Sequence, residues 1–400
     1  MARTQQVLVE SIIDHFQSLP DPRHTKNRRH LLVEVIVISM CGIIVGCEGP
    51  TAIERWAKAK QDWLKQVLKL PNGIPSHDCI HRILVMLKPE AFQQCFEKWI
   101  QSCLTRTSDK DAGTNYIAID GKTSRRSHDR SSGLGALHLV SAWAADHGVS
   151  LGQVATDEKS NEITAIPELL DQINVKGAIV TIDAMGCQKK ITQKILDGEG
   201  DYVLAVKRNQ PKLHDAVALF FESHWQDGDW IGGPCRRIET HDEGHGRIDD
   251  RYYYLAKIPD NHPVFSKWPG LKAIGMAIRV SEKDGETTED VRYYIISRYL
   301  SACRFSVAVR GHWSIENTLH WQLDVTFRED DSRARNRQLV NNLGWLRRFA
   351  ISLLKRHPSS HSVKGKSQIA GWNNDFLLQV LTGKGIYRPS LPPSSHESGT

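Results

Sequence analysis

The chain has 400 residues, of which 40% are hydrophobic and 24% are charged, a size and balance typical of a globular protein with two or three domains. Eight cysteines without a CxxC pair, and an N-terminus that lacks a signal-peptide pattern, argue against a secreted disulfide scaffold and indicate a cytoplasmic protein. The net charge of +6 is mildly basic, which permits a nucleic-acid partner without requiring one.

Residues 1–104 are expected to form an all-helical domain. The most apolar run, 31–47, predicts a buried helix rather than a membrane span, because Glu34 interrupts it and its length is at the short limit for spanning. Thr51 and Glu54 form a capping-box pattern, which predicts a helix from there to about Leu70. Ser76 is expected to cap a second helix over 77–87.

Two segments of this region are candidate DNA contacts. The order helix, turn, helix resembles a helix-turn-helix, whose second helix would carry His77 and Arg82 near its start. The basic run 23–30 includes Arg28 and Arg29 and is interpreted as an arm that contacts phosphates. The plainer alternatives are a helical hairpin and a solvated loop.

A polar linker is expected at 105–114, and the elements of an α/β sheet follow it. Three strands form a meander, and helices then alternate with two further strands, which indicates an antiparallel part and a parallel part. The expected strands are Tyr116–Asp120, 135–145, 149–156, Ala178–Asp183 and 202–206, and the expected helices are 163–173, Cys187–Leu196 and Lys212–Trp225.

The sequence pattern changes at 228–297, where few residues favour a helix. Strand-like runs predict a β-rich insertion there, at 236–240, 247–255, 271–280 and 287–296. A helix from about Arg310 that leads into a charged loop, and a strongly amphipathic helix over 338–355, complete the core at 298–357. The Ser-, Pro- and Gly-rich tail, 358–400, is expected to be partly disordered apart from a short helix at 375–381.

Three acidic residues are the candidate catalytic and metal-binding set. Asp120 and Asp183 each end a short apolar strand, and ligands gather at the carboxyl ends of strands in an open α/β sheet. Glu316 lies on a helix face with His312 and His320 four residues to either side. Converging carboxylates need counter-charge, which two Mg²⁺ (or Mn²⁺) ions would supply for cleavage of a phosphodiester.

At this point the sequence resembles a known family. The segments YIAIDGK, AIVTIDAMGCQ, DYVLAVKRNQP, HGRIDDR and RGHWSIENTLHWQLDVTFREDDSRAR are similar to those of bacterial insertion-sequence DDE transposases, and more narrowly of the H-repeat-associated (ISAs-type) group. FQSLPDPRHTKNRRHLLVEVI and GIPSHDCIHRIL match that group's helical N-terminal region.

The resemblance implies an RNase H-like catalytic core over 115–227 and 298–357, and a triad of Asp120, Asp183 and Glu316. It also implies metal-dependent cleavage and strand transfer at the element's terminal inverted repeats, with target DNA as the second substrate and a homodimer in the synaptic complex. The chain would work in the bacterial cytoplasm, on the nucleoid when bound to DNA.

The residues expected to contact DNA near this site are mostly basic. Related enzymes carry Tyr, Arg and Lys around the Glu, but here those positions hold Val309, His312 and Leu323, which shifts phosphate contacts to His312, His320 or Arg310. The candidates around the strand ends and in the insertion are Lys122, Arg125, Lys207, Arg208, Asn209, His245 and Arg247.

Two alternative functions stay open at this stage. The spacing of His312, Glu316 and His320 could serve a zinc hydrolase, although it would leave both strand-end aspartates without a role. The second alternative is a catalytically silent, sequence-specific DNA-binding protein derived from such an element.

Overall fold

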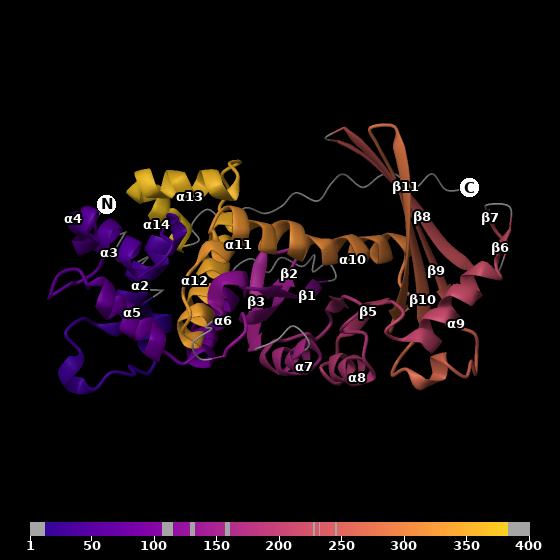
Figure 1. The fold of residues 1–400 in the computed structure, drawn as a ribbon, viewed down its shortest axis with the longest axis horizontal. Helices are drawn as coiled ribbons and strands as arrows, with labels where there is room; N and C mark the ends of the chain where they lie inside the picture. The colour runs from indigo at the N-terminus through magenta and orange to yellow at the C-terminus, as the bar shows by residue number, and fades with distance from the viewer. Residues whose placement is uncertain are drawn as a thin grey trace. The chain divides into compact units, whose positions relative to one another are not determined.

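A computed structural model describes residues 13–105, 115–128, 133–156, 161–226, 229–231, 233–244 and 246–382 of the chain (Figure 1). The chain divides into two compact units. The first comprises Met1–Cys103 and Leu346–Thr400, and the second comprises Leu104–Trp345. The predicted linker at 105–114 lies outside the described residues except for its first residue. His245 and the tail beyond Thr382 also lie outside them.

The first unit is helical throughout the part that the structure describes. Its helix α2 is buried along nearly its whole length, which explains the apolar run in the sequence, and no helix among the described residues is long and apolar enough to cross a membrane. Its elements are η1 (Thr25–Asn27), α2 (Leu32–Ile44), α3 (Pro50–Ala59), α4 (Gln61–Val67), α5 (His77–Met86), α6 (Pro89–Thr105), α13 (Val363–Trp372) and α14 (Asn374–Thr382), together with the end of α12 (Arg337–Arg356).

Several local predictions in this unit need correction. Helix α3 begins after Gly49 with Pro50 in its first turn, so Thr51 lies inside the helix and forms no capping box. Glu54 instead binds the ammonium of Lys58 at 2.7 Å. The helix also breaks at Lys60, and residues 68–76 make a longer connection to α5 than the turn of a helix-turn-helix.

Other local predictions in this unit are confirmed or extended. The Ser76 hydroxyl accepts a hydrogen bond from the Cys79 amide and caps α5. The short helix expected near 375–381 is present as α14, but α13 was not predicted. Ser362 caps α13, and the Ser367 hydroxyl donates to the carbonyl of Ile44 at 2.7 Å. These contacts order a segment whose composition is typical of a disordered tail.

The second unit is built on one nine-stranded sheet with the strand order β3-β2-β1-β4-β5-β11-β10-β9-β8. Strands β1, β4 and β5 run parallel, β2 pairs antiparallel with β1, and β3 pairs antiparallel with β2. The strands are β1 (Tyr116–Thr123), β2 (His138–Ala144), β3 (Val149–Thr156), β4 (Ile179–Ile182), β5 (Asp201–Val206), β8 (Cys235–Gly244), β9 (Arg247–Lys257), β10 (Ala273–Lys283) and β11 (Glu286–Ile296).

Alternation along the strands separates two apolar layers. Ile117, Val180 and Leu204 pack with helices α7, α8 and α9 on one face of the sheet. Tyr116 and Ile179, which have the opposite parity, pack with α10 on the other face. Figure 1 shows α10 crossing the strands on the side away from α7 and α8. The helices and short elements are α7 (Glu162–Gln172), α8 (Lys189–Asp197), α9 (Pro211–Glu222), α10 (Ala302–Ser314), α11 (Trp321–Val325), β6 (Trp225–Gln226), β7 (Asp229–Trp230), η2 (Arg125–Ser127), η5 (Phe265–Lys267) and η7 (Glu329–Asp331).

The β-rich region before helix α10 is present, but its strands do not form a separate sheet. Residues 293–296 of β11 pair antiparallel with residues 203–206 of β5, and β10, β9 and β8 follow in turn. The predicted strand runs were correct, whereas the sequence carried no sign of the strand with which they pair.

Helix α10 is seated on the sheet through a close contact that requires glycine. A Cβ atom on Gly275 of β10 would lie 2.4 Å from the ring of Phe305, which is fully buried on α10. The absence of a side chain at Gly275 therefore lets the helix approach the strands.

We expect Gly275→Ala to lower the free energy of unfolding by about 1–3 kcal/mol, because overpacking forces the helix or the strand to shift. The matched control is Gly244→Ala in β8, where an added Cβ meets nothing within 4 Å. Denaturant titration of both variants measures the difference, and equal stabilities would contradict the proposed packing constraint.

Candidate active site

Asp120 and Asp183 lie side by side where the parallel part of the sheet ends. Their preceding residues, Ile119 and Ile182, are partners in the parallel ladder of β1 and β4, and neighbouring strands lie about 4.8 Å apart. By alternation both aspartates project from the face that carries α10. Asp120 does not end its strand as expected, because β1 continues to Thr123 in its pairing with β2.

Glu316 lies above these strand ends, between two histidines that contact them. The Nδ1 atom of His312 lies 3.4 Å from the hydroxyl of Thr181 on β4, and the Nδ1 atom of His320 lies 3.5 Å from Oδ2 of Asp120. Asp183 and Glu316 line the same cleft, and the charges of both act on Asp120, so the three acidic residues that the sequence selected lie near one another.

The helix that carries Glu316 is not the regular α-helix that the sequence predicted. Residues Ile315–His320 form a π-helix between α10 and α11, and such segments occur frequently at functional sites. The apolar residues Ile315 and Leu319 stay fully buried, while Glu316 is exposed. No proline or other breaker in the segment signals this wider turn, so sequence periodicity could not reveal it.

The carboxylates form an electrostatically unfavourable cluster. Burial, followed by the negative charges of Asp183, Glu316 and Glu162, raises the pKa of Asp120 to about 7. Oδ1 of Asp183 accepts hydrogen bonds from the amides of Met185 and Gly186 at 3.0 and 3.3 Å, which fixes its orientation.

The donor set matches a hard divalent cation in chemistry, because carboxylate oxygens are the ligands of Mg²⁺ and Mn²⁺ and positive charge would relieve the repulsion at Asp120. Among the described residues, no three His, Cys, Asp or Glu side chains already stand in a metal-holding arrangement. The imidazoles of His312 and His320 contact different strands, so their placement does not support the alternative zinc site.

His312 is electrically neutral at physiological pH. Its burial, with a smaller contribution from the charge of Arg292, lowers its pKa to about 4, although the nearby Asp183 acts in the opposite direction. The residue is thus able to offer a hydrogen bond to a phosphate, but not the cationic contact that its position in the sequence suggested.

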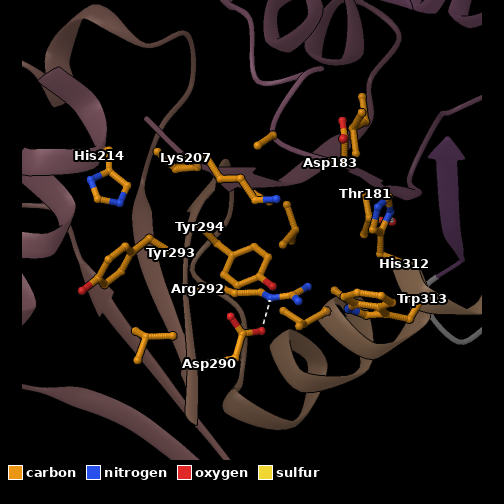
Figure 2. Close-up of a pocket in the computed structure, with 18 of the residues that line it drawn as sticks. Thr181, Asp183, Lys207, His214, Asp290, Arg292, Tyr293, Tyr294, His312 and Trp313 are labelled. Atoms are coloured by element: carbon orange, nitrogen blue, oxygen red, sulfur yellow. Dashed lines mark hydrogen bonds and ion pairs between the residues drawn. The ribbon is translucent and has the colours of Figure 1, made fainter. Parts of the chain in front are cut away.

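A cleft of about 490 Å³ opens beside Asp183 and Glu316. Lys207 and Arg208 line it at the end of β5, and Figure 2 shows the Lys207 side chain extending toward its centre. Asn209 has a structural part in this wall, because its amide donates to the carbonyl of Ala184 at 2.6 Å and so holds the turn after Asp183.

Lys122 occupies a different position from the phosphate contact that was predicted. Its side chain is 9% exposed, and its ammonium lies 2.8 Å from carboxylate oxygens of both Asp324 and Asp330. Glu329, itself buried, lies 3.7 Å away. Burial alone would lower the pKa of Lys122, but these carboxylates raise it above its ordinary value. The ion-pair cluster therefore fastens β1 to α11 and to η7, which follow the segment that carries Glu316.

The other candidate DNA contacts of the second unit remain partly exposed. Arg125 is 81% exposed and lies 3.2 Å from Asp330. Arg247 and Arg310 are each 47% exposed and are paired with aspartates at 2.9 Å.

In the first unit, the basic residues near the chain start are largely held by their own loop. Arg28 donates to the carbonyl of Arg23 at 3.0 Å, and its neighbour Arg29 is exposed. His77 lies 2.7 Å from the carboxylate of Glu54, and Arg82 donates to the carbonyl of Asp78 at 3.3 Å.

Two arginines that line a second cavity of this unit escaped the sequence argument. Arg279 of β10 and Arg292 of β11 line it together with Arg251 of β9, and Trp313 lies on α10 beside them. Each occupies an alternate position of a predicted strand or a helix face, but only the strand pairing shows that they meet.

Strand order β3-β2-β1-β4-β5, helices on both faces and acidic residues at β1, at the end of β4 and on the crossing helix define a nuclease core of the RNase H-like type. The model of the Transposase DDE domain matches residues 111–354, and the DDE_Tnp_1-associated model matches residues 13–100. The chain belongs to the DDE transposases, in their H repeat-associated group.

Relatives from Escherichia coli are similar over nearly their whole length. "H repeat-associated putative transposase YhhI" of strain K12 is 38% identical over 94% of this chain and 99% of its own length. "Putative protein YbfL" of the same strain is 37% identical with the same coverage. "Putative transposase YncI" of O157:H7 is 36% identical over 93% of this chain and 95% of its own length.

We expect Lys122→Met to destabilise the protein by about 3 kcal/mol, because it leaves the buried carboxylate of Glu329 and the partly exposed carboxylates of Asp324 and Asp330 without their counter-charge. Arg125→Met is the control, since its exposed pair with Asp330 is worth about 1 kcal/mol or less. Chemical denaturation reports both values, and equal losses would show that the Lys122 cluster has no special structural role.

Proposed function

We propose that this transposase cleaves DNA at the terminal inverted repeats of its insertion sequence and joins the freed ends to target DNA. The observation that carries the proposal is the approach of Asp120 within β1, Asp183 at the end of β4 and Glu316 on the helix that crosses them. The family match supports the same reaction class.

In this proposal the three carboxylates hold two Mg²⁺ or Mn²⁺ ions, which supply an activated attacking oxygen and stabilise the leaving oxygen of an in-line displacement. Asp183 enters this role already oriented by the amides of Met185 and Gly186.

The protein groups around the carboxylates bind and orient the DNA. Lys207 and Arg208 provide the positive wall of the cleft for the phosphate backbone. His312 is neutral and held near Thr181, so it is suited to donate a hydrogen bond without adding charge. The proposed assembly is a homodimer on paired element ends, acting on the bacterial nucleoid.

The second candidate is a protein that binds the same DNA without cutting it. The described structure favours catalysis, because the aspartates and Glu316 converge and Lys122 braces the catalytic segment. The two candidates differ in whether cleavage accompanies binding.

We expect Asp183→Asn to lower cleavage of duplexes carrying the inverted repeats that flank the gene by roughly 100-fold or more. The amide oxygen preserves the acceptor for Met185 and Gly186, so folding and gel retardation of the same duplex are expected to persist. Cleavage is measured by denaturing electrophoresis of end-labelled DNA.

The metal requirement provides the accompanying control. After treatment with EDTA, Mg²⁺ or Mn²⁺ should restore cleavage by the wild-type protein, whereas restoration by Zn²⁺ alone would favour the histidine site. Undiminished cleavage by the Asp183→Asn protein would refute the assigned triad, and retardation without any cleavage by the wild type would favour the silent DNA-binding protein.

A further inference from the structure

A second cleft, of about 440 Å³, lies on the α10 face of the β9–β11 strands. We call it the arginine groove and define it by its five arginines, which come from β9, β10, β11 and α10. They are Arg247, Arg251, Arg279, Arg292 and Arg310.

The register of the sheet explains why these side chains gather. Arg251 and Arg279 are direct partners across β9 and β10, and Arg279 is in turn opposite Asp290 of β11. Directly paired residues project from the same face, and this is the face on which Tyr253 and Tyr294 pack against Phe305 of α10.

Buried Asp249 fixes three of the arginines in place. Its Oδ1 lies 2.8 Å from Arg279, and its Oδ2 lies 2.9 Å from both Arg247 and Arg251. Burial acts to raise the pKa of Asp249, but the hydrogen bonds and charges of its partners hold it at about 2. Asp249 is therefore a permanent anion at neutral pH, and the guanidinium groups are oriented before any ligand binds.

The groove keeps an excess of positive charge after these pairs are counted. Asp242 binds Arg251 and Arg310, and Asp290 binds Arg292, so three aspartates serve five arginines. A guanidinium has five N–H donors in a planar fork, and one or two ion pairs leave donors for a phosphate. The side chains of Arg247, Arg279, Arg292 and Arg310 are between 34% and 47% exposed.

The arginine groove is continuous with the catalytic cleft. Asp290, Arg292, Tyr294, Val309 and Trp313 line both cavities. The Arg292 guanidinium lies 4.5 Å from the centre of the Trp313 ring, and Figure 2 shows the two side chains next to each other, with the ion pair from Arg292 to Asp290 drawn below them.

We propose that the arginine groove binds the phosphate backbone of the DNA strand that leaves the catalytic cleft, with Arg251, Arg279 and Arg292 as phosphate contacts beside Arg247 and Arg310. Planar, pre-oriented guanidinium forks match phosphate oxygens two at a time. The groove thus extends the DNA-binding surface from the carboxylates across the added strands β11, β10 and β9. This inference rests on the proposed action on DNA.

The test uses the full-length protein with EDTA present and fluorescent mixed-sequence duplex DNA, because phosphate contacts do not depend on sequence. The variant is Arg279→Gln/Arg310→Gln. Asp249 then retains Arg247 and Arg251, and Asp242 retains Arg251, so no buried carboxylate loses all its partners. Thermal melting confirms that the variant is folded.

We expect the slope of log K against log salt concentration to become shallower by about 2 in this variant, because each phosphate contact contributes about 0.9 to it. The charge-matched control is Lys176→Gln/Arg298→Gln, whose residues are 65% and 54% exposed and lie near the starts of β4 and β5, at the opposite strand ends from Asp183. This control should keep the wild-type slope.

The outcomes separate the two proposals. A wild-type slope in the groove variant, with normal wild-type binding, overturns the groove and leaves the active site untouched. A change in self-association by sedimentation without a change in DNA slope also overturns it and assigns the surface to a second copy of the chain. Failure of the wild-type protein to bind any DNA would refute the underlying proposal of function.

Discussion

The arrangement of the second unit depends on holding three carboxylates close together against their mutual repulsion. The cost is visible at Asp120, whose pKa rises to about 7 through burial and through the charges of its acidic neighbours. A fold maintains such a cluster only if the elements that carry the carboxylates are fixed by other interactions. The rest of the unit can be understood as the source of those interactions.

The simplest of these interactions is the packing of side chains that alternate between the two faces of the sheet. Asp120 has the parity of Tyr116, and Asp183 has the parity of Ile179, so the apolar residues that dock on α10 also determine the direction of both aspartates. Moving either strand by one residue would place its aspartate among the apolar side chains under α7 and α8. The hydrophobic pattern therefore determines the direction of the proposed catalytic aspartates as well as the packing of the core.

The crossing helix is fixed near each end, while its middle adapts. Phe305 docks on Gly275 early in α10, and Asp324 at the end of α11 binds Lys122. Between these anchors the chain forms a π-helix, which sets the contacts of His312 with β4 and of His320 with β1. Both ends of the helix are held in place. We infer that the π-helix adjusts the rotation of the helix between them, so that His312 reaches β4 and His320 reaches β1.

The sequence identified the elements of this unit well because each has a strong local signal. Apolar runs that end in Asp120 and Asp183 mark parallel strands, and the strand-like runs at 228–297 were also correct. Strand partners, the π-helix and the burial of Lys122 were not predictable, because they depend on contacts between residues that are far apart in the chain. For Lys122, a basic residue after a strand-end aspartate suggested a phosphate contact, whereas three distant carboxylates determine its position.

Because the core sheet continues through β11, the proposed active site has a second proposed DNA-binding surface beside it, the arginine groove. Since β11 pairs with β5, the residues of β9–β11 that share the α10 face lie in line with the end of β5, where Lys207 and Arg208 line the catalytic cleft. An independent lobe would have to be positioned by its own interface. In a continuous sheet, the pairing of one strand fixes the position of the residues next to it. Tyr294 and Ile296 of β11 pair with β5, and Arg292, two and four residues before them, therefore lies where the two clefts meet. The same hydrogen-bond ladder thus orients the carboxylate site and the arginine groove.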